Sequence, residues 1–452
     1  MKKVKGYKKL ILRDLGDGLI LRRGSRNDAD ALAEFNAKIH SDDGPEQPDE
    51  RIAAWSRDLA EKPHPTFKPG DFTIVENTST GEIVSSLNLI SQTWTYAGIP
   101  FGVGRPELVG TLPEYRNLGL IRAQFDVIHK WSDDRGELVQ AITGIPYYYR
   151  QFEYEMGLSL GGGRIGYKPH VPKLKEGEQE PYQIRPAEVS GMDFIADLYQ
   201  QAGERYLIKC LRDKTTWRYE LDGKSDRNIN RELLRVIETN DGILVGYLVH
   251  GASTWGPTMI AVNYEIIPEH SWASVTPSVV RYLYRTGESF AKTEDKGEDF
   301  SGFGFWLGTD HPVYQVMKDR LPRIRNPYAW FIRVPNLPDF LQHIKPALDQ
   351  RLENSAFNGH TGELKITFYR SGLRLSFQAG HLKQIEPWKP EPQGHSGEAA
   401  FPDLTFTQLL FGYRTLDELD YAYADCWKKD DEAYGLLNAL FPKIPSNIWP
   451  IS

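Results

Sequence analysis

The segment from Val109 to Arg122 constrains the fold more than any other part of the chain. It reads Val-Gly-Thr-Leu-Pro-Glu-Tyr-Arg-Asn-Leu-Gly-Leu-Ile-Arg. The apolar run that ends at Leu112 predicts a strand, and Pro113 ends that strand. From Leu118 onward, apolar residues recur at the three- and four-residue spacing of a helix. The segment therefore predicts a strand, a tight loop and a helix.

The loop before this helix is suited to bind an anion. The first turn of a helix has backbone N–H groups without intrahelical partners, and the helix dipole adds partial positive charge there. Gly119 has no Cβ, so a phosphate could approach the backbone closely, and Arg116 and Arg122 add fixed positive charge. A capped surface helix often has the same features, so the loop alone leaves both interpretations open.

The elements around this segment follow a definite order. A short strand from Leu19 leads into a helix, and residues 72–76 and 83–90 predict a hairpin. A further strand ends at Leu112, and residues 138–144 predict another strand after the helix. The predicted order is strand, helix, hairpin, strand, loop, helix and strand.

The sequence Arg-Asn-Leu-Gly-Leu-Ile at 116–121, within this order of elements, resembles the Arg/Gln-x-x-Gly-x-Gly/Ala loop of the GNAT N-acetyltransferases. In that superfamily the loop holds the pyrophosphate of acetyl-CoA. The resemblance therefore implies that acetyl-CoA is a cosubstrate, bound by the loop and the end of the preceding strand. The residues implicated are Val109, Thr111, Arg116, Asn117, Leu118, Gly119, Leu120, Ile121 and Arg122.

A tyrosine-rich segment, Pro146 to Glu155, follows the next strand. Its Tyr149-Arg-Gln-Phe-Glu-Tyr is similar to the Tyr-x-Arg-Phe-Gly-Tyr segment of the Eis-like (enhanced intracellular survival) branch of GNAT acetyltransferases. In the GNAT fold, the strands before and after the CoA helix splay apart around the thioester. The resemblance implies that Tyr149 is the general acid for the departing thiolate, with Tyr148 as the alternative. An aromatic core with hydroxyls at its edge is the competing interpretation.

The chain after a proline- and charge-rich stretch at 166–183 repeats the opening order. Tyr182 begins a predicted strand, turn and helix, and a hairpin turns at Asp241-Gly242. No Arg-x-x-Gly follows the strand that ends at Ile267. By resemblance this part is a second GNAT-like unit that has no CoA loop. This unit is expected to form one wall of the substrate cleft. An unrelated mixed α/β domain is the alternative.

The last part begins near Pro338 with a helix, followed by two alternating strands across the Arg370-Ser371-Gly372 turn. It resembles the small sterol-carrier-protein-like domain at the C-terminal end of Eis-like chains. Because that fold holds lipids in other settings, lipid carriage is the competing role for this segment.

The end of the chain, Ala439 to Ser452, is apolar and rich in proline, which predicts that it is packed rather than free. In Eis-like enzymes the terminal carboxylate reaches the active site as the base. The resemblance therefore implies that role for Ser452, and a packed terminus without chemistry is the alternative.

Composition limits the other function classes. The net charge is −7 with a pI near 5.9, which argues against binding nucleic acid through phosphate neutralisation. Cys210 and Cys426 cannot form a disulfide framework or a cysteine-based metal site, so no metal is predicted. The sequence has no apolar stretch long enough to span a membrane, and the start, Met1 to Lys5, does not read as a signal peptide; we expect a cytoplasmic protein.

These observations predict an α/β (α+β) fold with two tandem GNAT-like mixed sheets flanked by helices and a small α+β sterol-carrier-protein-like domain. The expected domains are 1–168 with the acetyl-CoA site, 180–336 without a CoA loop, and 337–452. We expect direct acetyl transfer from acetyl-CoA to an amine of an aminoglycoside, a polyamine or a lysine side chain, and the resemblance implies a homo-oligomer. The alternatives are a non-catalytic lipid- or ligand-binding protein with relic GNAT units, and a tandem-GNAT transferase of a longer acyl group.

Overall fold

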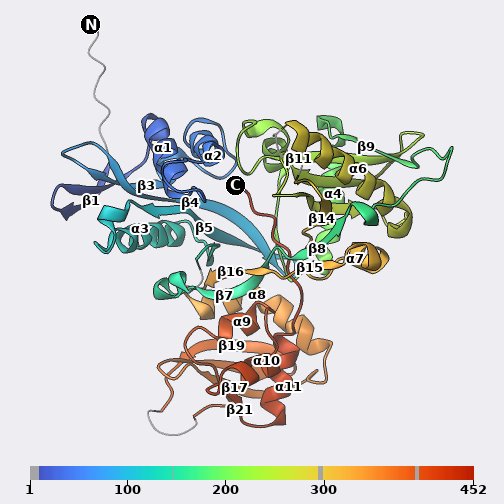
Figure 1. Ribbon diagram of the computed structural model, residues 1–452. Helices are drawn as coiled ribbons and strands as arrows, with labels where there is room; N and C mark the ends of the chain where they lie inside the picture. The colour runs from blue at the N-terminus through green and yellow to red at the C-terminus, as the bar shows by residue number, and fades with distance from the viewer. Residues whose placement is uncertain (1–9, 146, 294–298, 392–395) are drawn as a thin grey trace.

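The computed structural model describes residues 10–145, 147–293, 299–391 and 396–452 (Figure 1). The start, Met1 to Lys5, and Pro146 of the tyrosine-rich segment lie outside the described residues. Within the described chain, three mixed sheets of nine, seven and five strands are flanked by helices, which confirms the predicted fold class. No helix in these described ranges is long and apolar enough to cross a membrane. Cys210 and Cys426 are both buried and free.

The first sheet is built mainly from the N-terminal third of the chain. Its strands run in the order β1 (Ile11–Gly16), β2 (Leu19–Arg23), β3 (Phe72–Asn77), β4 (Ile83–Tyr96), β5 (Ile99–Thr111), β6 (Val139–Ile142), β16 (Tyr328–Arg333) and β7 (Glu155–Leu160), and β10 (Ile208–Cys210) pairs with β4. Helices α1 (Ala29–Ile39) and α2 (Glu50–Glu61) pack on one face of the sheet, and α3 (Leu120–Asp134) packs on the other. The apolar residues of α3 with helical spacing, Phe125 and Ile128, enter the core as the sequence predicts.

The first sheet opens between β5 and β6. These parallel strands pair only at Val103 with Val139 and at Gly104 with Gln140. Beyond this point β5 continues against β4 alone, with a register shift opposite Leu108, whose φ is +51°. A non-glycine residue in that conformation marks a local distortion of the strand. The second half of β5 therefore faces a gap that no strand of the described residues fills.

The second sheet has the order β15 (Arg323–Arg325), β8 (Gly163–Tyr167), β14 (Gly302–Phe305), β13 (Thr258–Ile266), β12 (Leu244–Gly251), β11 (Glu232–Thr239) and β9 (Tyr182–Pro186). Helices α4 (Met192–Ala202) and α5 (Lys214–Arg218) lie on one face, and α6 (Trp272–Thr293), with the short α7 (Val313–Val316), lies on the other. The order β11–β12–β13–α6–β14 repeats β3–β4–β5–α3–β6, and the strand after the helix is again parallel to the strand before it.

The first two sheets exchange strands across the predicted domain limits. Strand β8 lies before residue 168 but belongs to the second sheet, whereas β10 and β16 lie after residue 180 and belong to the first. The limits 1–168, 180–336 and 337–452 stay a prediction for the units of the chain.

The third sheet has the order β19 (His381–Trp388), β18 (Gly372–Gln378), β17 (Gly362–Thr367), β20 (Ala399–Ala400) and β21 (Trp427–Lys428). It packs with α8 (Leu337–Glu353), α9 (Phe406–Leu410), α10 (Leu416–Ala422) and α11 (Asp431–Leu440). The predicted hairpin across Gly372 is present as β17 and β18, and β19 is a strand that the sequence did not indicate.

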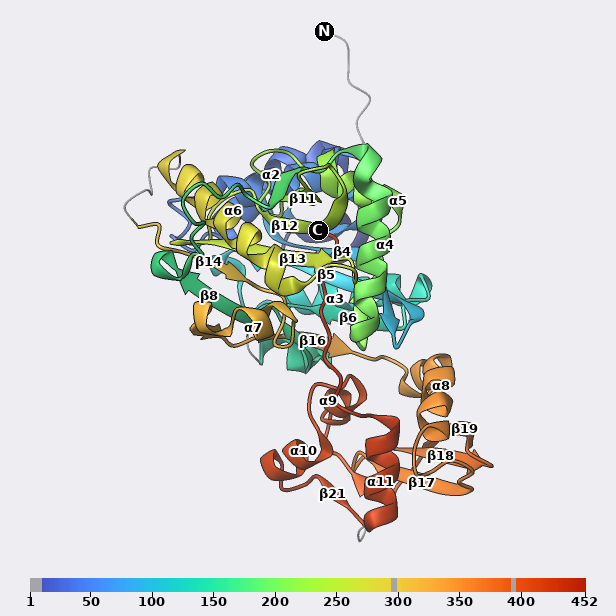
Figure 2. The same cartoon turned by 90° about the vertical axis from the view of Figure 1, so that its right-hand side faces the viewer.

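The chain after α11 leaves the third sheet and runs back between the first two (Figures 1 and 2). Its backbone is bonded to the β10 region, where the N–H of Leu207 donates to the Pro445 carbonyl at 2.8 Å. Ile448, Trp449, Ile451 and Ser452 are buried. The terminal segment is therefore packed, as its composition predicts.

Candidate functional site

The loop between β5 and α3 forms the rim of a cavity of about 730 Å³. Gly119 precedes the first residue of α3 with φ of +74°, a conformation that glycine adopts without strain. A Cβ at Gly119 would meet no heavy atom within 4 Å, so this position is open toward the cavity. All the predicted loop and strand residues line the cavity except Leu118, whose side chain is 58% exposed and lies outside it.

Tyr149 forms one wall of this cavity. It lies in the short 3-10 helix Tyr148–Phe152, where the Phe152 ring stacks on Phe125 of α3 with centroids 4.4 Å apart. Gly144 has φ of +139°, and a Cβ there would stand 3.0 Å from Tyr149 Cε2 and 3.3 Å from its hydroxyl oxygen. Burial, followed by the nearby Glu107 carboxylate, raises the pKa of the Tyr149 phenol well above its usual value. Tyr149 is therefore protonated at neutral pH, which is the state that a proton donor needs.

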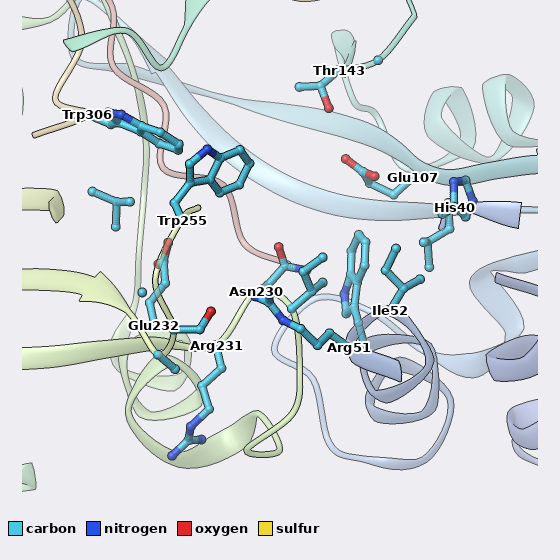
Figure 3. A pocket seen from close by; sticks show the side chains of 18 of the residues that line it. His40, Arg51, Ile52, Glu107, Thr143, Asn230, Arg231, Glu232, Trp255 and Trp306 are labelled. Atoms are coloured by element: carbon cyan, nitrogen blue, oxygen red, sulfur yellow. The ribbon is translucent and has the colours of Figure 1, made fainter. Parts of the chain in front are cut away.

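A second cavity, of about 620 Å³, lies between the first and second sheets (Figure 3). It is lined by β5 and the β6 end on one side and by the β11 and β13 regions of the second sheet on the other. Four residues line both cavities, namely His40, Val109, Ile145 and Tyr149. The two cavities therefore meet at Tyr149, in the gap that the splaying of β5 and β6 creates. We refer to them below as the loop cavity and the inter-sheet cavity.

Ser452 lies near this junction but does not line either cavity in the described chain. Arg105 of β5 connects it to the site, because the guanidinium donates to the Ile451 carbonyl at 3.1 Å and to Ser452 Oγ at 2.9 Å, and also pairs with Glu107. The hydroxyl of Tyr219 donates to an oxygen of the Ser452 α-carboxyl group at 3.1 Å. Ser452 thus contacts Arg105 of β5. Among the described residues, no contact joins Ser452 to Tyr149.

Two residues that the sequence reasoning missed lie at the junction. Glu107 is a charged residue within a buried strand, and its carboxylate lines the inter-sheet cavity, pointing toward Thr143 (Figure 3). His40 follows α1, and its Nε2 is shielded from solvent without a hydrogen-bond partner among the described residues. Burial lowers the pKa of His40, so the imidazole is neutral at pH 7. The signal that could have indicated this cluster was a basic residue, Arg105, and an acidic residue, Glu107, in an otherwise apolar strand.

The described residues contain no group of three or more His, Cys, Asp or Glu side chains placed to hold a metal ion.

Residues 26–157 match the acetyltransferase (GNAT) domain family. No curated protein sequence matches the chain significantly. Among solved structures, the chain is similar to a probable N-acyltransferase from Enterococcus faecalis V583, at 13% identity, 95% coverage of this chain, 97% of that chain and a TM-score of 0.61. A GCN5-related N-acetyltransferase from Kribbella flavida gives 17% identity, 95% and 97% coverage and a TM-score of 0.61.

Eis1 from Mycobacterium abscessus is similar at 16% identity, with coverage of 94% of this chain and 98% of that chain and a TM-score of 0.56. At these identities the likeness shows a shared fold along nearly the whole chain. The family match shows a GNAT acetyltransferase domain within residues 26–157, and it covers β3 to β6 of the first sheet together with α1, α2 and α3.

Proposed function

We propose that this protein transfers an acetyl group directly from acetyl-CoA to the amine of a small molecule or of a lysine side chain. The observation that carries the proposal is the meeting of the loop cavity and the inter-sheet cavity at Tyr149. A donor held in one cavity and an amine held in the other would present their reacting atoms to each other in the gap between β5 and β6.

The loop cavity has the features that an acetyl-CoA pyrophosphate needs. Backbone N–H groups of the first turn of α3 point toward the loop, Gly119 leaves space beside them, and Arg116 and Arg122 line the same cavity. When bound, acetyl-CoA supplies the acetyl group as a thioester. The part of β5 from Arg105 to Thr111 has no strand on the β6 side, so its backbone N–H groups that face the gap are available to a developing negative oxygen.

The proton balance assigns two further roles. A primary amine with a pKa of about 10 arrives mostly protonated and must lose a proton before it can attack. The leaving thiolate must gain a proton, and Tyr149 is the proposed donor, with Tyr148 as its alternative. The predicted base is the α-carboxyl group of Ser452, which accepts a hydrogen bond from Tyr219, while Arg105 donates to the Ser452 side-chain hydroxyl. Glu107 is a second candidate base, because its carboxylate lines the inter-sheet cavity directly.

The test is release of free thiol from acetyl-CoA in the presence of aminoglycosides, polyamines and lysine peptides. Tyr149→Phe should lower kcat by about 10²-fold or more, because a positioned acid contributes roughly that much. Tyr421→Phe, at a 95% exposed tyrosine of α10, is the matched control and should leave kcat unchanged. Loss of activity in Glu107→Gln but not on deletion of Ser452 would assign the base to Glu107. No thiol release with any amine, together with no calorimetric binding of acetyl-CoA, would overturn the proposal.

A cavity of about 810 Å³ at the edge of the third sheet favours lipid carriage as a second candidate function. Its lining includes Phe368, Leu373, Leu404 and Phe406. Binding of a fluorescent fatty acid that is lost in Leu373→Arg, with no acetyl-CoA turnover, would support this candidate. The homo-oligomer, the cytoplasmic location and transfer of a longer acyl group stay predictions.

A further inference from the structure

The inter-sheet cavity has an aromatic wall at the end that belongs to the second sheet. Trp255 is 62% exposed although it lines the cavity, and its ring stands edge-on to Trp306 at 4.8 Å between centroids. The Arg325 guanidinium covers the Trp306 ring at 3.5 Å and so holds that ring in place. Figure 3 shows the two indoles together at one end of the cavity and Glu107 and His40 at the other. A large indole left uncovered inside a cavity is a surface for a flat apolar ligand.

The carboxylates of this cavity are poorly suited to hold a polycation. Glu107 is already paired with Arg105. Glu232 accepts a hydrogen bond from Trp449 Nε1 at 2.6 Å, and burial, which disfavours the charged carboxylate, raises its pKa to about 7. The cavity therefore offers little uncompensated negative charge to a ligand with several ammonium groups.

Several other polar groups that line the cavity are donors without an acceptor function. Arg51 lies exposed at its edge, and the indole Nε1 atoms of Trp55 and Trp306 are shielded from solvent without hydrogen-bond partners among the described residues. An indole N–H only donates, and so does an ammonium group, so these positions cannot satisfy a second or third amine. The Arg51 guanidinium would also repel one.

From the exposed Trp255, the Trp306 ring behind it and the shortage of free carboxylates, we infer that the acceptor is a monoamine carried on an aromatic body. This inference rests on the proposed function, because it names the substrate class of the same site. The aromatic body lies against Trp255, and the single amine reaches the Tyr149 end of the cavity. Aminoglycosides and polyamines, which carry several ammonium groups, are poor acceptors.

The experiment compares kcat/KM for tryptamine, hexylamine, spermidine and kanamycin in the thiol-release assay, in the wild type, Trp255→Ala, Trp255→Phe and Tyr421→Ala. Tryptamine should exceed spermidine and kanamycin by about tenfold or more, as one good aromatic contact provides. Trp255→Ala should raise the KM for tryptamine by about tenfold with little change in kcat, whereas Trp255→Phe restores most of the loss. Tyr421→Ala, at an exposed aromatic residue of the third sheet region, should behave as the wild type.

Truncation of Trp255 should leave the fold intact, because its backbone carries the local bonds: its N–H donates to the Thr258 carbonyl at 2.8 Å, and the Thr258 N–H donates back at 3.1 Å. A higher kcat/KM for spermidine or kanamycin than for tryptamine overturns the inference while leaving the proposed function standing. An equal loss in Trp255→Ala for tryptamine and hexylamine also overturns it. If no amine releases thiol, calorimetric titration of tryptamine and spermidine into the wild type and Trp255→Ala decides the inference by the same ranking.

Discussion

Replacement of Gly144 by alanine should disturb Tyr149 without touching any charged group of the site. Gly144 has φ of +139°, which L side chains rarely adopt, and the added Cβ would stand 3.0 Å from Tyr149 Cε2 and 3.3 Å from its hydroxyl oxygen. The backbone strain alone should cost about 1–3 kcal/mol of unfolding free energy. The contact also requires the Tyr149 ring to shift by a few tenths of an ångström or more.

The same replacement should also slow catalysis. A proton donor displaced by about 1 Å can lose about 10²-fold in rate, so we expect Gly144→Ala to lower kcat about 10- to 100-fold with a smaller change in KM. Urea denaturation measures the loss of stability, and thiol release at saturating acetyl-CoA measures kcat.

Gly136→Ala is the matched control for this prediction. Gly136 also has a positive φ, of +70°, but a Cβ there would meet nothing within 4 Å. Its replacement should cost roughly 1–2 kcal/mol of stability and leave kcat within about twofold of the wild type. If Gly144→Ala retains full kcat while losing stability, the rate does not depend on the position of Tyr149, and the reasoning that assigns it the acid role fails.

Three further predictions concern charge. Arg212→Met should lower the unfolding free energy by about 3–5 kcal/mol in urea denaturation, because it leaves the fully buried Glu220 with one cation fewer. Arg218→Met, at an exposed ion pair, should cost under about 1 kcal/mol. Similar losses of unfolding free energy in the two variants would contradict the burial argument. Glu232 has a folded pKa raised to about 7, so the protonated form is favoured in the folded protein and its contribution to stability is lost as pH rises from about 5 to 7. Glu232→Gln should therefore gain stability relative to the wild type across that window, by at most about 1.4 kcal/mol per pH unit, and a constant difference would refute the assignment. Arg122→Gln should raise the KM for acetyl-CoA about tenfold with kcat nearly unchanged, since it removes one phosphate-binding charge at the loop cavity; an unchanged KM would exclude Arg122 from the donor site.

Local patterns predicted the elements of the first sheet well. The strand, loop and helix at 109–122 are present because each depends on residues within a few positions of one another: the apolar spacing of α3, Pro113 after the strand and Gly119 at the helix start. The hairpin of β3 and β4 is present for the same reason, since its turn contains Gly81 with φ of +75°.

Contacts between distant parts of the chain were not predictable in this way. The distortion at Leu108 depends on what packs against β5, and periodicity does not encode that. The short strand β10 joins the first sheet through only three residues, Ile208 to Cys210, which carry too little pattern to indicate a partner. Ser452 is buried, as expected for a packed chain end. Its contact with Arg105 could not be predicted, because the two residues lie far apart in the sequence.

Strand β16 has a consequence for how this protein is made. Residues 328–333 lie between β6 and β7, strands that end at residues 142 and 160, so the first sheet has a missing member until the ribosome has added more than two thirds of the chain. During that interval β6 and β7 each present an unpaired edge, which invites pairing with the wrong chain. A nascent or truncated product that stops before residue 328 should therefore depend on chaperones, even though it contains every residue of the loop that is proposed to bind the donor.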